Sequence, residues 1–525
     1  KEEQATYDML CRADSIGVFQ VESRAQMGLL PRLQPRTFYD LVVQIALVRP
    51  GPIQGGAVHP FVRRKLGREP ITYDHPKLVE PLERTLGVPI FQEQLMQVAM
   101  AVGGCTGDDA DLLRRAMGSK RGLERIESLR ETLYAGMASN GITGQLADEI
   151  YGRIQAFANF GFAESHSISF ALLVYASSWI KLHYPGVFLA SLLRAQPMGF
   201  YSPASLTADA ERHGVEVRGP CIVRSGVEAG LERVDLTVDD PFSPLPKDAR
   251  RATPTGLASC TNRVQPPVPV FRPDSADGEL EDLIPHRRDG DLAVRMGLGA
   301  VSGLGKETAD KVIAERERFG PYRDLTDLVY RTGLTAAQVE SLATAGAFEV
   351  WGMTRREALW AAGAAAQARP EFLPGSVVAV QPPLFDDLEP AERMVADLVS
   401  TGVAPGDHPV RYARDRLRAR GVLSARDLRS AEPGRRIEVA GVVTHRQRPA
   451  TASGITFLNL EDETGLANII CSVGLWGRYR RTVRESRALI VRGILERSPE
   501  GVVNVVADRV EALSLKATMP SRDFR

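Results

Sequence analysis

Four basic side chains lie close together in residues 108–121, which read DDADLLRRAMGSKR. Arg114 and Arg115 are adjacent, and Lys120 and Arg121 follow a glycine and a serine. A guanidinium offers a planar fork of donors that matches phosphate oxygens. The stretch therefore predicts a helix end that binds a ligand with several phosphates. On spacing alone, a solvated basic helix end is the alternative.

A single histidine, His166, lies between two serines, directly after the aromatic stretch 157–162 that reads FANFGF. The chain has no G-x-S-x-G motif and no convincing set of partners for Ser/His/Asp hydrolysis. A helix that begins here would present backbone N–H groups, which favour an anion. We therefore expect His166 to contact a phosphate, and a structural role for a lone histidine is the alternative.

A glycine-rich turn, Gly303-Leu304-Gly305, separates two apolar segments and is followed by Lys306 and Lys311. Such a turn between two helices can offer its N–H groups to one phosphate without reading any base. The two lysines would add positive charge. The pattern predicts a DNA-backbone contact, with an ordinary helix–helix turn as the alternative. It lacks the strand–G-x-G-x-x-G–helix order of a dinucleotide site.

Two pairs of aspartates, Asp108 with Asp111 and Asp386 with Asp387, raise the question of a metal site. Magnesium sites for phosphoryl transfer need carboxylates that converge on two ions about 4 Å apart. The first pair is better explained as the acidic start of a helix, and the second lies in a polar stretch. We therefore predict no metal ligand in this chain.

The elements that must position these side chains are mostly helices over residues 1–215. Apolar residues recur there at the spacing of amphipathic helices. The predicted helical segments are 15–30, 93–101, 110–117, 122–138, 146–157 and 167–183. Two prolines and three glycines in residues 49–56 (RPGPIQGG) predict a rigid, turned loop.

Composition changes after residue 215. Residues 216–290 combine short strands, up to about 235, with a stretch rich in Pro, Ser, Asp and Arg that predicts an insertion or linker. A catalytic lid is the less favoured interpretation of that stretch. Residues 291–360 return to helical spacing, and 361–430 predict a linker with a short helical segment around 410–417.

Residues 431–525 switch to the two-residue period of β-strands, with a turn at 462–465 (DETG). About five short strands in this length predict a small barrel, most simply an OB-fold. One face could bind single strands through aromatic and basic side chains. The candidates are Phe457, Trp476, Tyr479, Arg478, Arg480 and Arg481. A barrel used for packing or protein contact is the alternative.

Composition also restricts the class of protein. Lys+Arg and Asp+Glu both number 65 in the 525 residues, so any nucleic-acid surface must be local. The five cysteines are far apart and form no C-x-x-C pair, which argues against a zinc site and suits the cytoplasm. We find no signal peptide and no apolar run long enough to cross a bilayer.

Six stretches in this order resemble the C-family bacterial DNA polymerase III alpha subunits. They are 17–27 (GVFQVESRAQM), 46–56 (ALVRPGPIQGG), 63–73 (RRKLGREPITY), 91–99 (FQEQLMQVA), 111–120 (DLLRRAMGSK) and 157–167 (FANFGF-x-x-SHS). The resemblance implies a multidomain α+β fold. The implied parts are a helical fingers domain over 1–215, a tandem helix-hairpin-helix region over 291–360 and an OB domain over 431–525.

Within this family the chain is most similar to the error-prone, damage-tolerance branch, the second DnaE-type polymerases. Ala163-Glu164 stands where the replicative pattern has Asn-Lys, and the chain ends soon after the OB region with 521–525 (SRDFR). The replicative alpha subunit and a non-catalytic DNA-binding or repair scaffold are the alternatives. Cys221-Ile222-Val223 replaces a usual Asp-Val-Asn run, which puts the strand expected there in question.

The resemblance also implies roles for residues. The family's palm, with its catalytic carboxylates and Mg²⁺, would precede residue 1, as would its PHP domain, so we expect no catalytic residue in this chain. The nucleotide-binding residues would be Arg114, Arg115, Lys120 and His166, and the DNA-binding residues Gly303, Gly305, Lys306 and Lys311. Glu164, two residues from His166, should weaken the binding of the triphosphate.

The expected partners are primer-template DNA and deoxynucleoside triphosphates, with no membrane. The linker stretch QPPLF at 381–385 resembles the short motif that docks on the sliding clamp, with Gln381, Leu384 and Phe385 as its key residues. Five residues match easily by chance. An accessory damage-tolerance protein that reaches the clamp is therefore the alternative.

Overall fold

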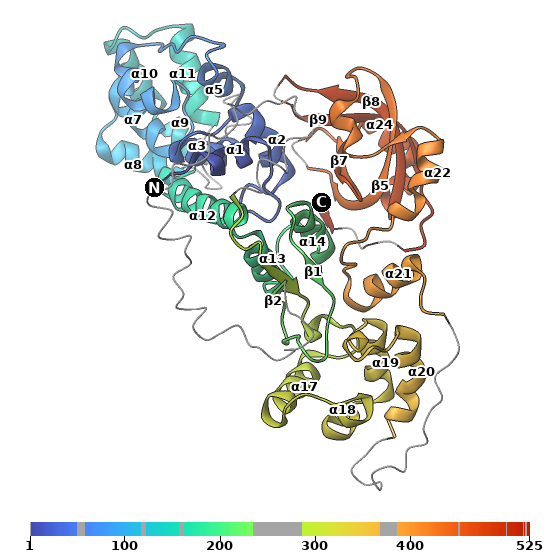
Figure 1. The fold of residues 1–525 in the computed structure, drawn as a ribbon. Coiled ribbons are helices and arrows are strands. Elements are labelled where there is room, and N and C mark those ends of the chain that lie inside the picture. The colour runs from blue at the N-terminus through green and yellow to red at the C-terminus, as the bar shows by residue number, and fades with distance from the viewer. Residues whose placement is uncertain are drawn as a thin grey trace. The chain divides into compact units, whose positions relative to one another are not determined.

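The computed structural model describes residues 2–49, 58–116, 122–156, 162–234, 286–367, 386–449, 452–499, 501–517, 519 and 522–524. The chain divides into two compact units, Lys1–Trp179 and Ile180–Arg525, and each is described by itself. The first unit is helical, and the second combines helices with a C-terminal barrel (Figure 1). The predicted α+β fold class is confirmed.

The first unit consists of helices joined by short turns. They are α1 (Gln4–Cys11), α2 (Arg24–Leu33), α3 (Phe38–Leu47), α5 (Val58–Lys65), η1 (Pro76–Leu78), α6 (Val79–Leu82), η2 (Glu83–Thr85), α7 (Gln92–Gly103), α8 (Gly107–Ala116), α9 (Gly122–Ser128), α10 (Arg130–Ser139), α11 (Gln145–Ala156) and α12 (Glu164–His183). The helix predicted over 15–30 is wrong in its first half. The Ser15 hydroxyl donates to the Val21 carbonyl oxygen and holds a turn, and Ser23 then caps α2.

The helices α7 to α11 enclose one hydrophobic core. Its buried members include Leu95, Val98, Leu113, Leu133, Met137 and Ile150. Two glycines allow α7 and α10 to touch, because a Cβ atom on Gly136 would lie 2.1 Å from the carbonyl oxygen of Gly103. This packing fixes α8, which carries the adjacent arginines, through its buried residues Ala110, Leu113 and Ala116.

The second unit begins with two helices and a small sheet. These are α13 (Pro185–Arg194), α14 (Pro203–Arg212), β1 (Val217–Arg218), β2 (Gly230–Arg233) and β3 (Leu292–Arg295), with strand order β1-β3-β2. Strands β2 and β3 are antiparallel and pair Arg233 with Leu292. The Val234 N–H donates to the Asp291 carbonyl oxygen at 2.9 Å. The Pro- and Ser-rich insertion therefore leaves and returns at the same end of a hairpin.

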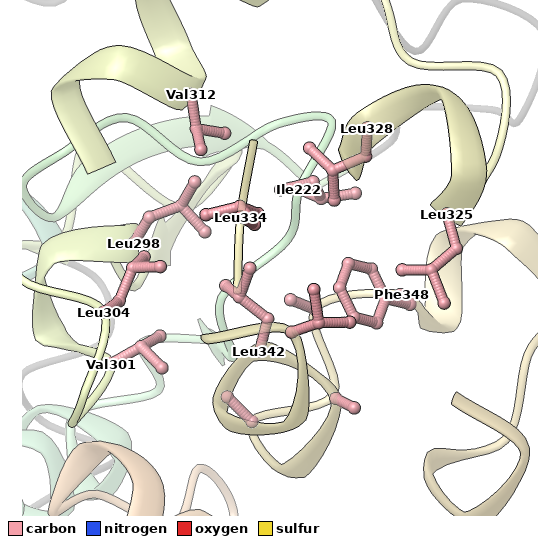
Figure 2. Close-up of a cluster of buried hydrophobic side chains, with 14 of the residues drawn as sticks. Ile222, Leu298, Val301, Leu304, Val312, Leu325, Leu328, Leu334, Leu342 and Phe348 are labelled. Carbon is pink, nitrogen blue, oxygen red and sulfur yellow. The ribbon is translucent and has the colours of Figure 1, made fainter. Parts of the chain in front are cut away.

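The next region contains short helices around a shared core. They are η5 (Leu298–Ala300), α17 (Lys306–Phe319), α18 (Leu325–Thr332), α19 (Ala336–Thr344), η6 (Glu349–Trp351) and α20 (Arg355–Ala365). Figure 2 shows part of this core, in which Leu304 and Leu334 lie among residues from several helices. Cys221-Ile222-Val223, where a strand was in question, forms a turn instead, and Ile222 is buried in the same core.

A helix that the sequence analysis missed, α21 (Pro390–Thr401), lies in the stretch expected to be a linker. Proline at its first position and a capping box between Glu389 and Glu392 mark its start. Arg355 of α20, almost fully buried, donates to Asp397 of α21 at 2.7 Å, which ties the two helices together. The proline and the capping box are the features of the sequence that could have predicted this helix.

The C-terminal region is a five-stranded barrel with short added strands. Its elements are η7 (Arg411–Ala413), α22 (Arg414–Ala419), β4 (Val422–Leu423), α23 (Asp427–Ser430), β5 (Arg436–Gln447), β6 (Thr456–Asp462), β7 (Gly465–Cys471), α24 (Val473–Glu485), β8 (Ala488–Arg497), β9 (Val503–Ala512) and β10 (Arg522–Phe524). The order β5-β6-β7-β9-β8 closes where β8 pairs with β5. The β4 and β10 strands both pair with β5.

The β5 strand is buried on both of its faces. Val439 and Val443 point into the barrel core, whereas Ala440 and Val442 belong to a second cluster outside the barrel. Residues from α14, η7 and α22 complete that outer cluster. On the neighbouring strand β6, the Ser205 hydroxyl of α14 donates to the buried carboxylate of Glu461 at 2.7 Å. One side of the barrel is therefore used for packing within the unit.

Candidate functional site

The start of α12 is held by α3. The Ser167 hydroxyl donates to the Val42 carbonyl oxygen at 2.6 Å, and the Tyr39 hydroxyl donates to the Glu164 carboxylate at 2.7 Å. Helix α3 itself starts from a capping box between Thr37 and Asp40. These contacts set the position of His166, which lies between Glu164 and Ser167 in the first turn of α12.

His166 is exposed, yet aromatic neighbours hold its ring on both sides. The ring lies edge-on to Phe162, with centroids 5.4 Å apart, and to Phe170, with centroids 4.3 Å apart. His166 and Phe170 are four residues apart in α12, which places them on one helix face, and Phe162 lies two residues before the helix begins. Phe170 also stacks on Phe19 at 5.3 Å. In the described part of the chain, neither ring nitrogen of His166 has a hydrogen-bond partner, so both remain available to a ligand.

The expected effect of Glu164 on a bound triphosphate finds no support in its surroundings. Its carboxylate is almost fully buried, accepts the Tyr39 hydrogen bond and forms an ion pair with Arg84 at 3.1 Å. The backbone N–H of Glu164 donates to Glu93 at 3.0 Å. The negative charge is thus balanced inside the unit, and Glu93 occupies the first N–H group of the helix.

The adjacent arginines of α8 are exposed and share one carboxylate. Arg114 contacts one oxygen of Asp111 at 2.8 Å, and Arg115 contacts the other oxygen at 2.7 Å. The hydrogen bond from Arg114 and the charge of Arg115 lower the pKa of Asp111. An incoming phosphate would compete with this carboxylate for the two guanidiniums. Lys120 lies outside the described residues, and within them no contact joins Arg114 or Arg115 to His166.

The predicted DNA-binding turn is a hairpin between η5 and α17. Gly303 and Gly305 both have positive φ, at 85° and 79°, and Leu304 between them is buried. A Cβ atom on Gly303 would lie 2.9 Å from the Ser341 hydroxyl oxygen, so glycine is needed for conformation and for space. Lys306 begins α17, is 70% exposed and lies 3.5 Å from Glu228.

A second hairpin, Gly333-Leu334-Thr335, lies between α18 and α19 and shares the positive φ of the first residue, whereas Thr335 has a φ of -76° where Gly305 has 79°. Gly333 has a φ of 67°, and Leu334 is buried like Leu304. The two hairpins differ at the helix that follows. Thr335 and Gln338 form a capping box at the start of α19, whereas no side chain caps α17 among the described residues. The start of α17 is therefore not occupied by a side-chain cap and could donate to a phosphate, although the N–H groups of Ser302 and Leu304 in the hairpin itself donate to backbone carbonyl oxygens.

The residues predicted for single-strand binding on the barrel do not lie on one face. Trp476 and Tyr479 are on α24, which was not predicted, and pack against the barrel core. Arg478, Arg480 and Arg481 are exposed on the same helix. Phe457 alone is on the outward side of a strand, β6.

An apolar row that the sequence analysis missed crosses the outside of the barrel. Phe457 pairs with Ile470, Ile470 pairs with Val506, and Val506 pairs with Ile494. Neither β6 nor β7 carries a lysine or an arginine. The row itself offers apolar contact, and arginines occur on two of its strands, β8 and β9.

Two of the four aspartates considered as metal ligands, Asp111 and Asp387, are engaged by arginines. Asp111 accepts from Arg114 and Arg115, and Asp387 accepts from Arg393 at 2.8 Å. A metal ion would have to compete with these arginines for the two carboxylates. The proposed clamp motif, Gln381, Leu384 and Phe385, lies outside the described residues.

Three family models match the chain. They are the bacterial DNA polymerase III alpha subunit finger domain over residues 1–141, a helix-hairpin-helix motif over 214–358 and an OB-fold nucleic acid binding domain over 437–513. They occur in the order that the sequence predicted. The chain therefore carries a helical finger region, a helix-hairpin-helix region and an OB-type barrel.

Curated relatives match along the whole chain. An error-prone DNA polymerase of Cutibacterium acnes is 56% identical over 526 residues, which is 100% of this chain and 45% of the relative. Relatives of the same name from Nocardia farcinica and Mycobacterium bovis are 51% and 49% identical over all of this chain, and over 41% and 43% of their own lengths. The chain thus spans less than half of these relatives.

The comparisons confirm the resemblance to the error-prone branch and favour neither the replicative subunit nor a non-catalytic scaffold. Among solved structures, asparaginyl-tRNA synthetase from Pyrococcus horikoshii aligns with 19% of this chain and 23% of its own at 17% identity. Its TM-score of 0.16 is too low to support an argument. Within the described residues, no helix is both long and apolar enough to span a membrane.

Proposed function

We propose that this chain is part of an error-prone DNA polymerase, which adds deoxynucleotides to a primer during damage-tolerant synthesis and repair. The observation that carries the proposal is similarity along the whole chain, at 47–56% identity, to relatives named error-prone DNA polymerase. The scattered cysteines, four of them free and buried, suit action in the cytoplasm.

We assign separate binding functions to the regions of the chain. The regions are a fingers domain over 1–215, the tandem hairpins over 291–360 and the OB domain over 431–525. In the fingers, Arg114, Arg115, Lys120 and His166 would bind the triphosphate, since cations stabilise the charge that spreads over phosphate oxygens during transfer. In the hairpin region, Gly303, Gly305, Lys306 and Lys311 would hold the DNA backbone. The uncapped start of α17 and the exposed Lys306 support that assignment.

We place the phosphoryl-transfer centre outside this chain. Polymerases of this kind depend on divalent metal ions, and we propose Mg²⁺. The aspartate pairs of this chain do not fit such ions, because protein cations occupy Asp111 and Asp387. The chain would then bind nucleotide and DNA without catalysing transfer by itself.

Primer extension tests this division. The purified chain is incubated with primer-template, Mg²⁺ and the four deoxynucleoside triphosphates, alone and with a separately made segment from the unmatched part of the Cutibacterium acnes relative. We expect extension only in the mixture. Extension by the chain alone would contradict our placement of the centre. No extension in the mixture, with the intact relative active under the same conditions, would contradict the proposed contribution of this chain.

The salt dependence of DNA binding tests the hairpin assignment. Because each lost phosphate contact removes about one unit from the slope of log K against log salt, Lys306→Ala and Lys311→Ala should each lower the slope by about one. Arg323→Ala is the control, since Arg323 is 85% exposed in the same region and lies in the sequence between the two hairpins, outside both of them. An equal change in all three variants would mean that the hairpin has no special role.

Binding of a sliding clamp through Gln381, Leu384 and Phe385 is a further proposal, supported by the motif alone. Loss of clamp binding in a Leu384→Ala, Phe385→Ala double variant would support direct docking. If that variant binds the clamp as well as the parent chain does, an accessory damage-tolerance protein is the better explanation.

A further inference from the structure

Arg49 differs from most arginines of the first unit. It follows α3 directly after the C-cap Val48 and is partly buried, with its guanidinium carbon 4.0 Å from the centre of the Phe162 ring. Within the described residues, this guanidinium has no hydrogen bond and no ion pair. Burial without a partner lowers the pKa of Arg49.

Other partly buried arginines of this unit have partners for their charge. Arg64 contacts Glu69 at 3.1 Å and donates to the Leu86 carbonyl oxygen at 2.8 Å. Arg36 pairs with the buried carboxylate of Asp8. A desolvated guanidinium is costly unless something accepts its hydrogen bonds. That no acceptor for Arg49 lies among the residues that the structure describes therefore points to a site for an external anion.

The same ring contacts His166. Phe162 lies under the guanidinium of Arg49 on one side and edge-on to the imidazole on another, with ring centroids 5.4 Å apart. A cation–π contact uses the face of the guanidinium and leaves its in-plane N–H groups free. Two groups with unused hydrogen-bonding capacity thus flank one buried aromatic ring.

The helices α3 and α12 fix this pair. The Ser167–Val42 and Tyr39–Glu164 hydrogen bonds join the two helices. Arg49 follows the end of α3, and His166 lies in the first turn of α12 between the two residues that make these bonds. The first N–H of α12 already donates to Glu93. One N–H group of the helix terminus is thus occupied, and we assign anion binding at this point to the two side chains.

We propose that Arg49 is a further nucleotide-binding residue of this unit, which contacts the polyphosphate of a nucleoside triphosphate together with His166. The inference rests on the proposed function, because it assumes that the first unit binds nucleotides. Arginine matches two phosphate oxygens at once, and a polyphosphate is long enough to reach both side chains. Phe162 is the positioning residue for the two groups.

Equilibrium binding of inorganic tripolyphosphate, dATP and deoxyadenosine to the full 525-residue chain tests the inference. Arg49→Gln should weaken the binding of tripolyphosphate and of dATP about tenfold or more, since a charge-assisted, forked contact is lost. Arg49→Lys should recover part of the affinity. His166→Gln should weaken the same two ligands. Deoxyadenosine binding should not change in any of them.

Arg130→Gln is the matched control. Arg130 also lies over aromatic rings, those of Tyr134 and Tyr151, but its charge is paired with Glu127 at 2.9 Å. The Arg130→Gln variant should therefore bind tripolyphosphate with unchanged affinity. If Arg49→Gln is too unstable for binding measurements, as urea unfolding would show, the comparison of Arg49→Lys with Arg130→Lys replaces it. The Arg49→Lys variant alone should then weaken tripolyphosphate.

The outcomes separate the two proposals. If the parent chain binds tripolyphosphate and Arg49→Gln binds it equally well, the role of Arg49 is wrong and the nucleotide-binding function stands. If the parent chain binds neither tripolyphosphate nor dATP, the proposed nucleotide site fails and this inference fails with it.

Discussion

Tyr39 of α3 donates a hydrogen bond of 2.7 Å to Glu164, the first residue of α12, and Arg84 contacts the same carboxylate at 3.1 Å. Burial, followed by this hydrogen bond, raises the pKa of the Tyr39 hydroxyl. The position at which the error-prone pattern departs from the replicative one is therefore part of the packing beneath His166. Glu164 acts on the site through the position of α12.

We predict that Glu164→Lys destabilises the first unit and does not tighten nucleotide binding. The lysine would face Arg84 and leave the Tyr39 hydroxyl without an acceptor, and such losses cost about 1–3 kcal/mol. Urea unfolding of the chain measures this change. Glu164→Gln is the control, because it keeps an acceptor for Tyr39 and should cost less. If Glu164→Lys has unchanged stability and binds dATP more strongly, the negative charge of Glu164 weakens triphosphate binding directly, as the sequence predicted.

The two hairpins allow a matched test of DNA binding. Gly303→Ala and Gly333→Ala both place a side chain at positive φ, which costs about 1–2 kcal/mol. We expect both variants to lower stability, but only Gly303→Ala to weaken binding to duplex DNA. The reason is that no side chain caps the start of α17, whereas Thr335 and Gln338 cap the start of α19. Thermal unfolding and fluorescence anisotropy measure the two effects. Equal loss of affinity in both variants would show that the capping difference is irrelevant.

The carboxylate of Glu211 on α14 predicts a pH dependence of the second unit. It accepts the Gly406 N–H at 2.7 Å, and burial raises its pKa from 4.5 to about 7. The folded state therefore holds this proton more tightly than the unfolded chain, and stability from this group is lost as pH rises from about 4.5 to about 7.

Replacing Glu211 with glutamine keeps the acceptor oxygen and removes the titration. Glu211→Gln should raise the free energy of unfolding at pH 8 by about 1–3 kcal/mol and change it little at pH 4.5. Urea titrations at the two pH values provide the comparison. Glu340→Gln, at an exposed position on α19, should have no effect at either pH. If Glu211→Gln behaves in the same way, the carboxylate does not titrate in this window.

The hairpin between β2 and β3 predicts that the long insertion can be removed. The described strands on its two sides are joined where the Val234 N–H donates to the Asp291 carbonyl oxygen, so we expect that a Gly-Ser linker from residue 235 to residue 286 can replace residues 236–285. Shorter loops cost less entropy to close, and the second unit should keep its stability or gain up to about 2 kcal/mol. Chemical unfolding measures this, with a shuffled insertion of equal length as the control. A clear loss of stability would assign the insertion a structural role.

Local patterns predicted much of the element content from the sequence. Asp108 and Asp109 mark the start of α8, which the sequence predicts correctly. Pro390 and the Glu389–Glu392 capping box mark the start of α21 equally clearly, although that helix is not among the predicted ones. The helix expected from residue 15 failed because a Ser15 side-chain bond competes with the helical backbone. The barrel strands were found by their alternation, whereas α24 was overlooked and its aromatic residues were assigned to a strand face.

The sequence by itself determined the order of the modules and the resemblance to the family. Motifs such as RPGPIQGG and the Gly-Leu-Gly turn depend on local backbone chemistry, so they can be recognised directly in the sequence. It also identified His166, Lys306 and the adjacent arginines as candidates. Only the tertiary structure decided which charges are already paired. The ion pair of Glu164 with Arg84 and the stacking of Arg49 on Phe162 are outcomes of packing between segments far apart in the chain, and no local pattern encodes them. The pairing of Asp111 with Arg114 and Arg115, by contrast, follows from helical spacing within α8.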